Sequence, residues 1–337
     1  MAQKMNVLVV GAGSIGERHA RCFGSTGRVD VSLCDVDSKK CREVAERCQV
    51  SQSFVSWDDA LASDPAAIVI ATPADFHIPM ARNAVLNGCH VLIEKPLSIS
   101  ITGVAELQDL VAERGAFVSV AYVLRCHPTL AAMRSVLHSG RFGKPLQAVL
   151  VAGQHFPFYR PAYRQTYYTR HDTGGGAIQD SLTHWINAVE WLVGPVDRLV
   201  GDAEHLALEG VTVEDTVQVL TRHGDVLGCF QLNQHQAPNE STLTVICERG
   251  TIRFETHNNG WRWMVEPGDV WHDEDVRVIE RDAMFVAQAN HFLDILEGQA
   301  SPACTLAEAA QTLRVNLAIL ESVRSHSWQT ISKTVVT

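Results

Sequence analysis

The sequence predicts an α/β protein of two domains, in which a parallel sheet wound with helices precedes a second α/β domain with a large, open, mainly antiparallel sheet. Its 337 residues exceed the usual size of a single hydrophobic core. Short apolar runs alternate with helical patterns up to about residue 122, where the pattern changes. Because parallel neighbours need crossover connections, this alternation implies parallel strand pairing. We place the domains at residues 1–122 and 123–337.

The first domain is expected to alternate strands with helices throughout. Apolar runs bounded by turn residues predict strands at residues 5–10, 29–34, 66–71, 90–94 and 116–121. Helical patterns between them predict helices at residues 15–23, 38–48, 57–62, 79–87 and 101–114. A doubly wound sheet of this kind binds its ligands at the carboxyl ends of the strands.

The second domain follows a different pattern. A strand at residues 146–153 leads into a long aromatic-rich loop and then into a helix at residues 177–193. Apolar runs on either side of two glycine-containing turns predict β-hairpins at residues 216–233 and 243–255. Helices at residues 283–297 and 306–325 complete an antiparallel sheet with helices on one face.

The composition argues against several classes of protein. Hydrophobic residues make up 46% and charged residues 20%, as in ordinary globular domains. No apolar segment approaches the roughly 20 residues that span a bilayer, and residues 1–10 predict a buried strand rather than a signal peptide. The net charge of -10, without a basic cluster, argues against nucleic-acid binding. The nine scattered cysteines form no C-x-x-C pair, so we expect reduced thiols, no metal site and a cytoplasmic protein.

The strongest local motif is G-x-G-x-x-G at residues 11–16, between the first predicted strand and helix. Gly11 permits a tight turn, Gly13 lets the backbone approach a pyrophosphate, and Gly16 allows close packing of helix on strand. The helix N-terminus, which includes Ser14 and Ile15, favours phosphate charge. We interpret this region as a Rossmann dinucleotide-binding domain, with a glycine-rich turn that binds no ligand as the alternative.

Asp35 indicates which dinucleotide the domain binds. It ends the second predicted strand, close to the spacing of about 20 residues at which an acidic residue binds the adenosine ribose hydroxyls. Its carboxylate would repel the 2′-phosphate of NADP, and no arginine occupies the next position, Val36. The sequence therefore favours NAD over NADP, although Asp35 could also be an ordinary solvated residue at a strand end.

Several further motifs follow in a fixed order. They are Thr72-Pro73 with His77, then Glu94-Lys95-Pro96, then Gly174-Gly175-Gly176, and last Asp180-x-x-x-His184. In this order they resemble the Gfo/Idh/MocA oxidoreductases, the family of glucose-fructose oxidoreductase and inositol dehydrogenase. The resemblance covers nearly the whole chain. It implies a Rossmann domain followed by an α/β domain whose open sheet face often mediates homodimers or homotetramers.

The resemblance also implies residue roles. In the family, the lysine of E-K-P lies beside the nicotinamide and the substrate, often with a cis bond to the proline, and the histidine of D-x-x-x-H is often the proton-transfer residue. Lys95, Asp180 and His184 are therefore the candidate catalytic residues. Thr72, Pro73, His77, Glu94 and Lys95 join the candidate cofactor-binding residues. Leu182 and Asn187 depart from the glycine and aspartate that are usual in the family, which leaves the substrate open.

Physical arguments support these assignments. Lys95 follows a predicted parallel strand, at the edge of the sheet where ligands bind. Asp180 and His184 are four residues apart on one predicted helix and share a face, so both can contact one substrate. Histidine suits removal of an alcohol proton near neutral pH. The alternatives are an ordinary surface lysine and a structural Asp/His pair.

Residues 154–172 are unusually rich in aromatic and cationic side chains, namely Tyr159, Arg160, Tyr163, Arg164, Tyr167, Tyr168 and Arg170. Such side chains stack on sugar rings and bind hydroxyls, carboxylates or phosphates. We select Tyr163 and Arg164 as candidate substrate-binding residues, with an ordered interface loop as the alternative. If these residues bind substrate, the arginines suggest an acidic or nucleotide-linked sugar.

Tyr122 and Arg125 resemble a family segment that enters the second domain, although Val123 replaces a frequent asparagine there. Both are candidate substrate-binding residues, and Arg125 could equally stabilise the domain boundary.

The sequence thus predicts an NAD(P)-dependent dehydrogenase that acts on CH-OH groups of a sugar, a sugar derivative or a cyclic polyol, with Lys95 and His184 in proton transfer. Two alternatives stay open: an NAD-dependent glycosidase of the same fold, and a dinucleotide-sensing regulator without turnover.

Overall fold

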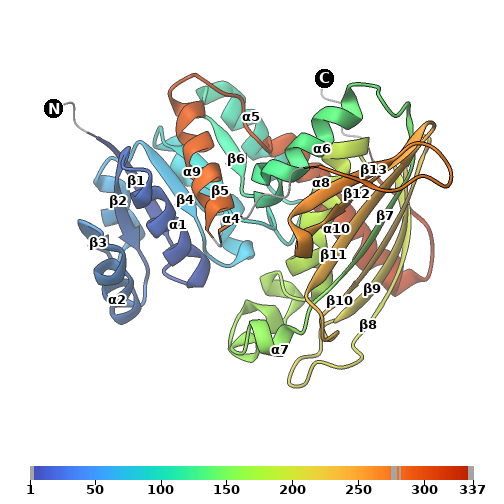
Figure 1. Ribbon diagram of the computed structural model, residues 1–337. Coiled ribbons are helices and arrows are strands. Elements are labelled where there is room, and N and C mark those ends of the chain that lie inside the picture. The colour runs from blue at the N-terminus through green and yellow to red at the C-terminus, as the bar shows by residue number, and fades with distance from the viewer. Residues whose placement is uncertain (1–3, 275–278, 281, 333–337) are drawn as a thin grey trace. The chain divides into compact units, whose positions relative to one another are not determined.

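The computed structural model describes residues 4–274, 279–280 and 282–332, which form two compact units (Figure 1). One unit comprises Met1–Cys126 with Glu280–Ala310, and the other comprises His127–Ile279 with Gln311–Thr337. The chain thus returns to the first unit near its C-terminal end, whereas we placed a single boundary after residue 122. The return is caused by an apolar helix, α9 (Ala283–Leu296), which packs on α1 (Ser14–Ser25) in the core of the first unit.

The first unit contains a six-stranded parallel sheet in the order β3-β2-β1-β4-β5-β6. Its strands are β1 (Met5–Val10), β2 (Val29–Cys34), β3 (Gln52–Phe54), β4 (Ala67–Ile70), β5 (His90–Ile93) and β6 (Val118–Val120). The remaining helices of this unit are α2 (Ser38–Cys48), α3 (Trp57–Ala62), α4 (His77–Leu86) and α5 (Val104–Arg114). The predicted doubly wound domain is confirmed.

Two helix starts differ from the prediction for local reasons. Helix α4 begins at His77 rather than at Pro79, because proline is tolerated in the first turn, where its missing N–H has no partner in the helix. Helix α5 begins at Val104 rather than at residue 101, because Gly103 adopts a left-handed conformation with φ 77° and ends the preceding turn.

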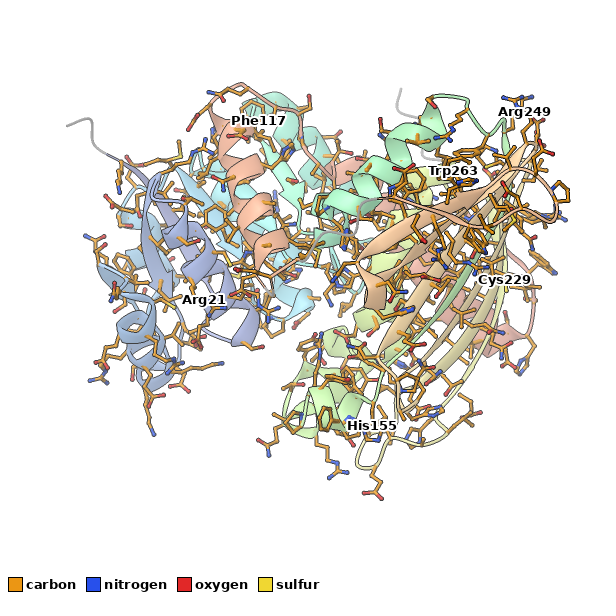
Figure 2. All side chains as sticks on the ribbon, viewed as in Figure 1. Arg21, Phe117, His155, Cys229, Arg249 and Trp263 are labelled. Carbon is orange, nitrogen blue, oxygen red and sulfur yellow. The ribbon has the colours of Figure 1, made fainter. Side chains whose placement is uncertain are left out.

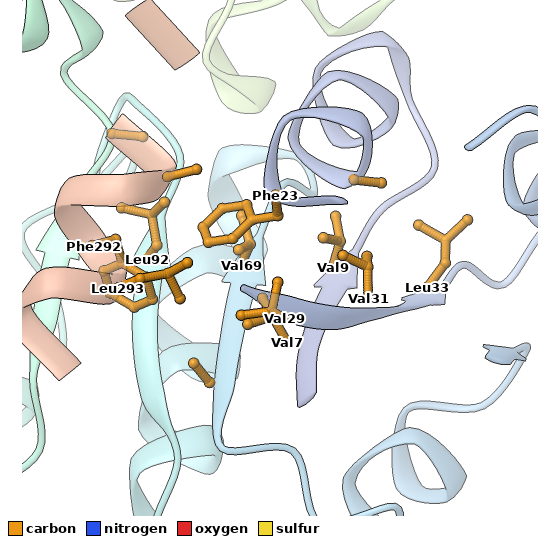
Figure 3. Packing of buried hydrophobic residues seen from close by; sticks show 14 of the residues in the cluster. Val7, Val9, Phe23, Val29, Val31, Leu33, Val69, Leu92, Phe292 and Leu293 are labelled. Atoms are coloured by element: carbon orange, nitrogen blue, oxygen red, sulfur yellow. The ribbon is translucent and has the colours of Figure 1, made fainter. Parts of the chain in front are cut away.

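The core of the first unit lies between β1, β2, β4 and helices α1 and α9 (Figure 3). Phe23 meets Phe292 edge to face, with ring centroids 6.2 Å apart, above Val69 and Leu92. Aromatic pairs in this geometry add about 0.5–1.5 kcal/mol to the burial of their surface. The packing explains why helix α9 belongs to this unit although most of the second unit precedes it in the sequence.

The second unit contains a nine-stranded sheet in the order β14-β13-β12-β11-β7-β10-β9-β8-β15. Among the described strands β7 and β10 run parallel and the other neighbours antiparallel, which confirms the mainly antiparallel sheet. The strands are β7 (Pro145–Gly153), β8 (Arg198–Glu204), β9 (Thr216–His223), β10 (Val226–Asn233), β11 (Glu240–Cys247), β12 (Gly250–Glu255), β13 (Gly260–Met264), β14 (His272–Asp273) and β15 (Gln329–Thr330).

Both predicted hairpins are present, as β9–β10 and β11–β12. Strands β3, β8, β13, β14 and β15 and helix α6 (Pro128–His138) were not predicted from the sequence. Two of these strands have only two residues each, and β8 combines charged residues with Gly201, so neither length nor alternation marks them.

Helices α6 (Pro128–His138) and α8 (Thr183–Val193) pack on one face of this sheet, and most of α10 (Leu306–Ser325) belongs to the same unit (Figure 1). The predicted helix at residues 177–193 is instead a π-helical turn, η6 (Ile178–Leu182), that continues into α8. The predicted loop before it contains the short helix α7 (Phe156–Tyr159) and three 3-10 turns, at Tyr163–Gln165, Tyr167–Thr169 and His171–Thr173.

All nine cysteines lie within the described residues and are free thiols. Within the part of the chain that the structure describes, no helix is long and apolar enough to cross a membrane.

Candidate functional site

The carboxyl ends of four parallel strands gather the candidate cofactor residues at one edge of the first sheet. Val10 pairs with Cys34 and with Ile70, and Ile70 pairs with Ile93, so these strands end in register. Gly11 follows β1, Asp35 follows β2, Thr72-Pro73 follows β4, and Glu94-Lys95 follows β5. The sheet register therefore brings these predicted residues together.

The glycine motif has the geometry that its spacing predicts. Gly11 has φ 99°, and a Cβ there would lie 2.5 Å from the Ala71 carbonyl oxygen. A Cβ on Gly16 would lie 1.7 Å from the Gly11 carbonyl oxygen, so only glycine fits. By contrast, a Cβ on Gly13 would meet no atom of the described residues within 4 Å. Two of the glycines thus serve backbone packing, and the third leaves space that a ligand can use.

This turn fits a dinucleotide. Helix α1 begins with Gly13 as its N-cap, and no side chain caps it, so its first N–H groups can receive a phosphate. The Asp35 carboxylate lies beside the same turn, where its Oδ2 accepts a hydrogen bond from Ala12 N at 2.6 Å and its Oδ1 accepts one from Asp37 N at 2.9 Å. A pyrophosphate at the helix and a ribose at Asp35 can therefore be bound together.

Glu94 is buried and joins the glycine-motif helix to the E-K-P segment. Its Oε1 lies 2.6 Å from Nε2 of His19, a buried residue of α1, and its Oε2 accepts the Lys95 N–H at 3.0 Å. Burial works to raise the pKa of the Glu94 carboxyl, but the hydrogen bond and charge of His19, with Lys95, outweigh it and hold the pKa below its usual range. His19 was not predicted to lie in the site, because no motif marks its contact with a residue 75 positions away.

His77 connects the other two cofactor loops. Its buried ring places Nε2 2.9 Å from the Thr72 carbonyl oxygen and Nδ1 3.0 Å from the Pro96 carbonyl oxygen. Burial lowers the pKa of His77, although both carbonyls favour its protonated form. The ring therefore ties the loop after β4 to the residues after Lys95, which is half-buried and is followed by a cis peptide bond to Pro96.

Tyr122 and Arg125, predicted to contact substrate, are both buried in the first unit. Arg125 Nη1 donates to Glu308 Oε1 at 2.6 Å and to the Ala303 carbonyl oxygen at 2.9 Å. These bonds fix the end of the first unit to its returning segment, and they favour the stabilising alternative for Arg125.

In the second unit, the three glycines allow the chain to pass between two close neighbours. A Cβ on Gly175 would lie 2.2 Å from the Tyr168 carbonyl oxygen. Gly176 has φ 88°, and a Cβ on it would lie 2.5 Å from the Glu214 carboxylate. Glu214 is buried and accepts the Ile178 N–H at 2.9 Å, so its charge lies at the start of η6. Glu214 also pairs with His171, whose pKa it raises.

Asp180 and His184 lie on η6 and α8, four residues apart, with Asp180 buried and His184 half-buried. Asp180 Oδ1 accepts the Tyr167 hydroxyl at 2.6 Å, and Oδ2 accepts the Ser181 hydroxyl at 3.1 Å. Two further hydrogen bonds extend this network. Gln234 Nε2 donates to the Ser181 hydroxyl oxygen at 2.9 Å, and the Tyr168 hydroxyl donates to Gln234 Oε1. Asp180 thus accepts hydrogen bonds through both carboxylate oxygens, and Gln234 behind Ser181 fixes the position of the Ser181 hydroxyl.

The aromatic-rich loop supplies residues of this cluster, but not those we selected. Tyr163 is buried against Phe156 and donates its hydroxyl to the Glu209 carbonyl oxygen at 2.7 Å, and Arg164 binds the same residue. Instead, Tyr167 and Arg160 lie at Asp180, with Arg160 Nη1 4.0 Å from Oδ1. Figure 2 shows the side chains of this loop, near the labelled His155. Sequence spacing does not distinguish these tyrosines and arginines, since the 3-10 turns decide which of them face η6.

The candidate catalytic residues thus belong to two groups, Lys95 in the first unit and Asp180 with His184 in the second. Among the described residues, no group of three or more His, Cys, Asp or Glu side chains could hold a metal ion.

Known proteins resemble this chain in sequence. A family model described as an oxidoreductase family with an NAD-binding Rossmann fold matches residues 5–122, and one for the GFO/IDH/MocA C-terminal domain matches residues 130–253. An inositol 2-dehydrogenase of Rubrobacter xylanophilus is 32% identical over 260 residues, which cover 75% of this chain and 72% of that protein. An uncharacterised oxidoreductase of Synechocystis sp. is 29% identical over 209 residues, 58% of this chain but only 56% of that protein's length.

Solved structures share the fold. Levoglucosan dehydrogenase in complex with NADH matches with a TM-score of 0.89 at 20% identity, covering 98% of this chain and 100% of that one. The WlbA dehydrogenase of Bordetella pertussis, in complex with NADH and UDP-GlcNAcA, matches with a TM-score of 0.83 at 22% identity and the same coverage.

These comparisons confirm the predicted NAD cofactor and the predicted class of NAD-dependent dehydrogenase. Since the two family models together match more than half of its residues, the chain belongs to the Gfo/Idh/MocA family of NAD-binding oxidoreductases.

Proposed function

We propose that this protein oxidises a secondary alcohol of a sugar, a sugar derivative or a cyclic polyol, or catalyses the reverse reduction, with Lys95 and His184 in proton transfer. The observation that carries the proposal is the edge of the first sheet, where the glycine turn, Asp35 and Lys95 follow adjacent strand ends. Relatives named inositol 2-dehydrogenase and UDP-N-acetylglucosamine 3-dehydrogenase support the substrate class.

The first unit is proposed to hold NAD, with the pyrophosphate at Gly13 to Ile15 and the adenosine ribose at Asp35. Bound NAD supplies the hydride acceptor. Lys95 would then lie beside the reacting carbon and donate a hydrogen bond to the alcohol oxygen. His19, Glu94 and His77 hold the backbone on both sides of Lys95, which keeps its direction constant.

The second unit is proposed to move the proton. As the carbon loses its hydride, the O–H bond breaks and its proton passes to His184, so that a carbonyl forms. Asp180 is a positioning residue in this scheme. It is buried, the Tyr167 and Ser181 hydroxyls hold it in place, and a carboxylate one helical turn before His184 would stabilise a positive charge on that imidazole.

The direct test is NADH absorbance when the purified protein and NAD meet a panel of inositols, aldoses, amino sugars, uronic acids and nucleotide sugars. We expect one class to react, and Lys95→Ala or His184→Asn to lower kcat by about 10²- to 10⁴-fold. His184→Asn should retain NADH binding, measured by fluorescence, which separates chemistry from cofactor loss. Full activity in both variants would contradict the assigned roles.

The same assay separates the two alternative functions. A glycosidase regenerates its cofactor at each turnover, so it would release sugar from glycosides without net NADH. A regulator would bind NADH, yet show no absorbance change with any substrate, and Lys95→Ala would leave its pathway intact.

We also propose a cytoplasmic homodimer or homotetramer that associates through the sheet of the second unit. Val151, Leu220 and Leu227, on β7, β9 and β10, are exposed apolar side chains on one face of this sheet. Exposed apolar side chains on a sheet face are a feature of protein interfaces. Light scattering should give a molar mass that is a multiple of the 37.0 kDa chain mass. Leu220→Lys should reduce that measured mass.

A further inference from the structure

We propose that the substrate of this enzyme is uncharged, a polyol or sugar without a carboxylate or phosphate, and that the Arg160–Asp180 pair selects for it. This inference rests on the proposed function and narrows its substrate class. It departs from the expectation that the arginines of residues 154–172 recognise an acidic or nucleotide-linked sugar. The observation behind it is that each of these arginines already has a carboxylate partner.

The three arginines of this loop, all within the described residues, are paired as follows. Arg160 Nη1 lies 4.0 Å from Asp180 Oδ1, Arg164 Nη2 lies 3.1 Å from Glu209 Oε2, and Arg170 forms a two-bond pair with Asp172. His171, which follows Arg170 in the chain, is paired as well, with Glu214. A carboxylate or phosphate that approached any of these cations would also approach a carboxylate, so the attraction and the repulsion largely cancel.

Arg160 is the arginine of this loop that lies at the proposed proton-transfer residues. Its side chain is 53% exposed, whereas that of Asp180 beneath it is 1% exposed. The negative charge of Asp180, 4.0 Å away, raises the pKa of Arg160. A ligand therefore contacts guanidinium N–H donors whose positive charge is largely cancelled by Asp180. Such donors suit hydroxyl oxygens rather than anions.

The surroundings of Arg160 suit an uncharged ring with hydroxyl groups. Tyr167 lies at the same carboxylate with a partly exposed ring, and Phe158 and Tyr159 are 75% and 45% exposed in the same loop. Aromatic faces contact the C–H faces of sugar rings, and burial of this apolar area favours binding. The partly exposed Tyr167 ring beside the charge-compensated Arg160 thus favours a polyol over a sugar acid.

The test compares matched ligands that differ in one anionic group. Calorimetry on the NADH-loaded protein would measure the affinity for D-glucose against D-glucuronate, myo-inositol against inositol monophosphate, and N-acetylglucosamine against its UDP conjugate. NAD reduction by the same compounds would be recorded separately. We expect the uncharged member of each pair that binds to bind at least about tenfold more tightly, a difference of about 1.4 kcal/mol.

Two variants test whether the Arg160–Asp180 pair selects for uncharged ligands, because they change the net charge of the pair in opposite directions. Asp180→Asn should raise the ratio of anionic to uncharged affinity about tenfold, since it leaves Arg160 as a net cation. Arg160→Gln should lower the same ratio, because the Asp180 charge is then uncompensated. Asp172→Asn is the matched control, because it exposes the charge of the solvated Arg170 and should change the ratio by less than about fivefold. Circular dichroism confirms that each variant is folded.

Each outcome bears on one proposal. Tighter binding of the anionic members, or ratios that neither Asp180→Asn nor Arg160→Gln changes, would overturn the inference even if NAD reduction shows a dehydrogenase. Preferential binding of uncharged members without any NAD reduction would leave the inference standing and overturn the proposed function. If no member of any pair binds, both fail.

Discussion

The two units build their parts of the proposed site in different ways. At the cofactor edge of the first unit, backbone geometry sets the contacts, since parallel register aligns the strand ends and Gly11 and Gly16 touch neighbouring carbonyls. Around Asp180 in the second unit, side chains from a loop, a π-helical turn and the residue after a strand form a hydrogen-bond network. The first arrangement leaves little freedom for substitution, whereas the second can change without changing the fold.

This difference suits the two tasks. A dinucleotide presents the same pyrophosphate whatever the substrate, so a backbone cradle serves it. The substrate varies, and side chains on a loop can be exchanged at small cost to stability.

The largest effect on stability is expected at His19. His19→Leu removes the imidazole that hydrogen-bonds the buried Glu94 carboxylate, which then keeps only the Lys95 N–H. A buried charge that loses its partner costs about 3–5 kcal/mol. Urea unfolding followed by tryptophan fluorescence measures the loss. The double variant with Glu94→Gln should regain part of it, because the buried charge is gone. A loss below about 1 kcal/mol would show that backbone geometry alone holds this edge.

Two glycine substitutions separate packing from cofactor binding. Gly16→Ala forces a Cβ against the Gly11 carbonyl oxygen, so the unfolding free energy should fall by about 3 kcal/mol. Gly13→Ala meets no atom of the described residues and should lose less than about 1 kcal/mol, yet its NADH affinity should fall about tenfold or more. Unchanged NADH affinity in Gly13→Ala would place the pyrophosphate elsewhere.

A pair of tyrosine variants compares the loop residue at Asp180 with the one we selected from the sequence. Tyr167→Phe removes a hydrogen bond to the buried Asp180 and should lower kcat/KM about tenfold, besides costing about 1.5–3 kcal/mol of stability. Tyr163→Phe removes a bond to the Glu209 carbonyl oxygen and should instead cost only about 1 kcal/mol of stability. Steady-state kinetics and urea unfolding of both variants make the comparison, and the opposite pattern would restore the original choice of Tyr163.

The smallest effect concerns pH and the pair of His171 with Glu214. The pKa of His171 is raised in the folded protein, so the pair stabilises fully below the unfolded pKa of about 6.5 and loses its contribution as the pH rises through the raised value. Because His171 is half-exposed, we expect less than about 1 kcal/mol. The measured quantity is the unfolding free energy of wild type minus that of His171→Gln. This difference should be larger at pH 5.5 than at pH 9, and a difference independent of pH would exclude a charged pair.

Much of the fold and of the cofactor edge was predictable, because the relevant signals are local. Alternating strands and helices, the glycine spacing, and the placement of Asp35 and Lys95 at strand ends depend on residues close together in the sequence. Parallel register then brings those ends to one edge without further information. The short strands β14 and β15 were not predictable, since two residues carry no alternation.

The sequence by itself determined the order of the domains' elements, the NAD-binding turn and the family, because backbone constraints on glycine, proline and strand periodicity act locally. Only the tertiary structure decided that α9 returns to the first unit, that His19 meets Glu94, and that Arg160 and Tyr167, rather than Tyr163 and Arg164, face Asp180. These contacts join residues far apart in the chain, or they depend on the direction of single side chains in irregular turns. Neither leaves a periodic trace in the sequence.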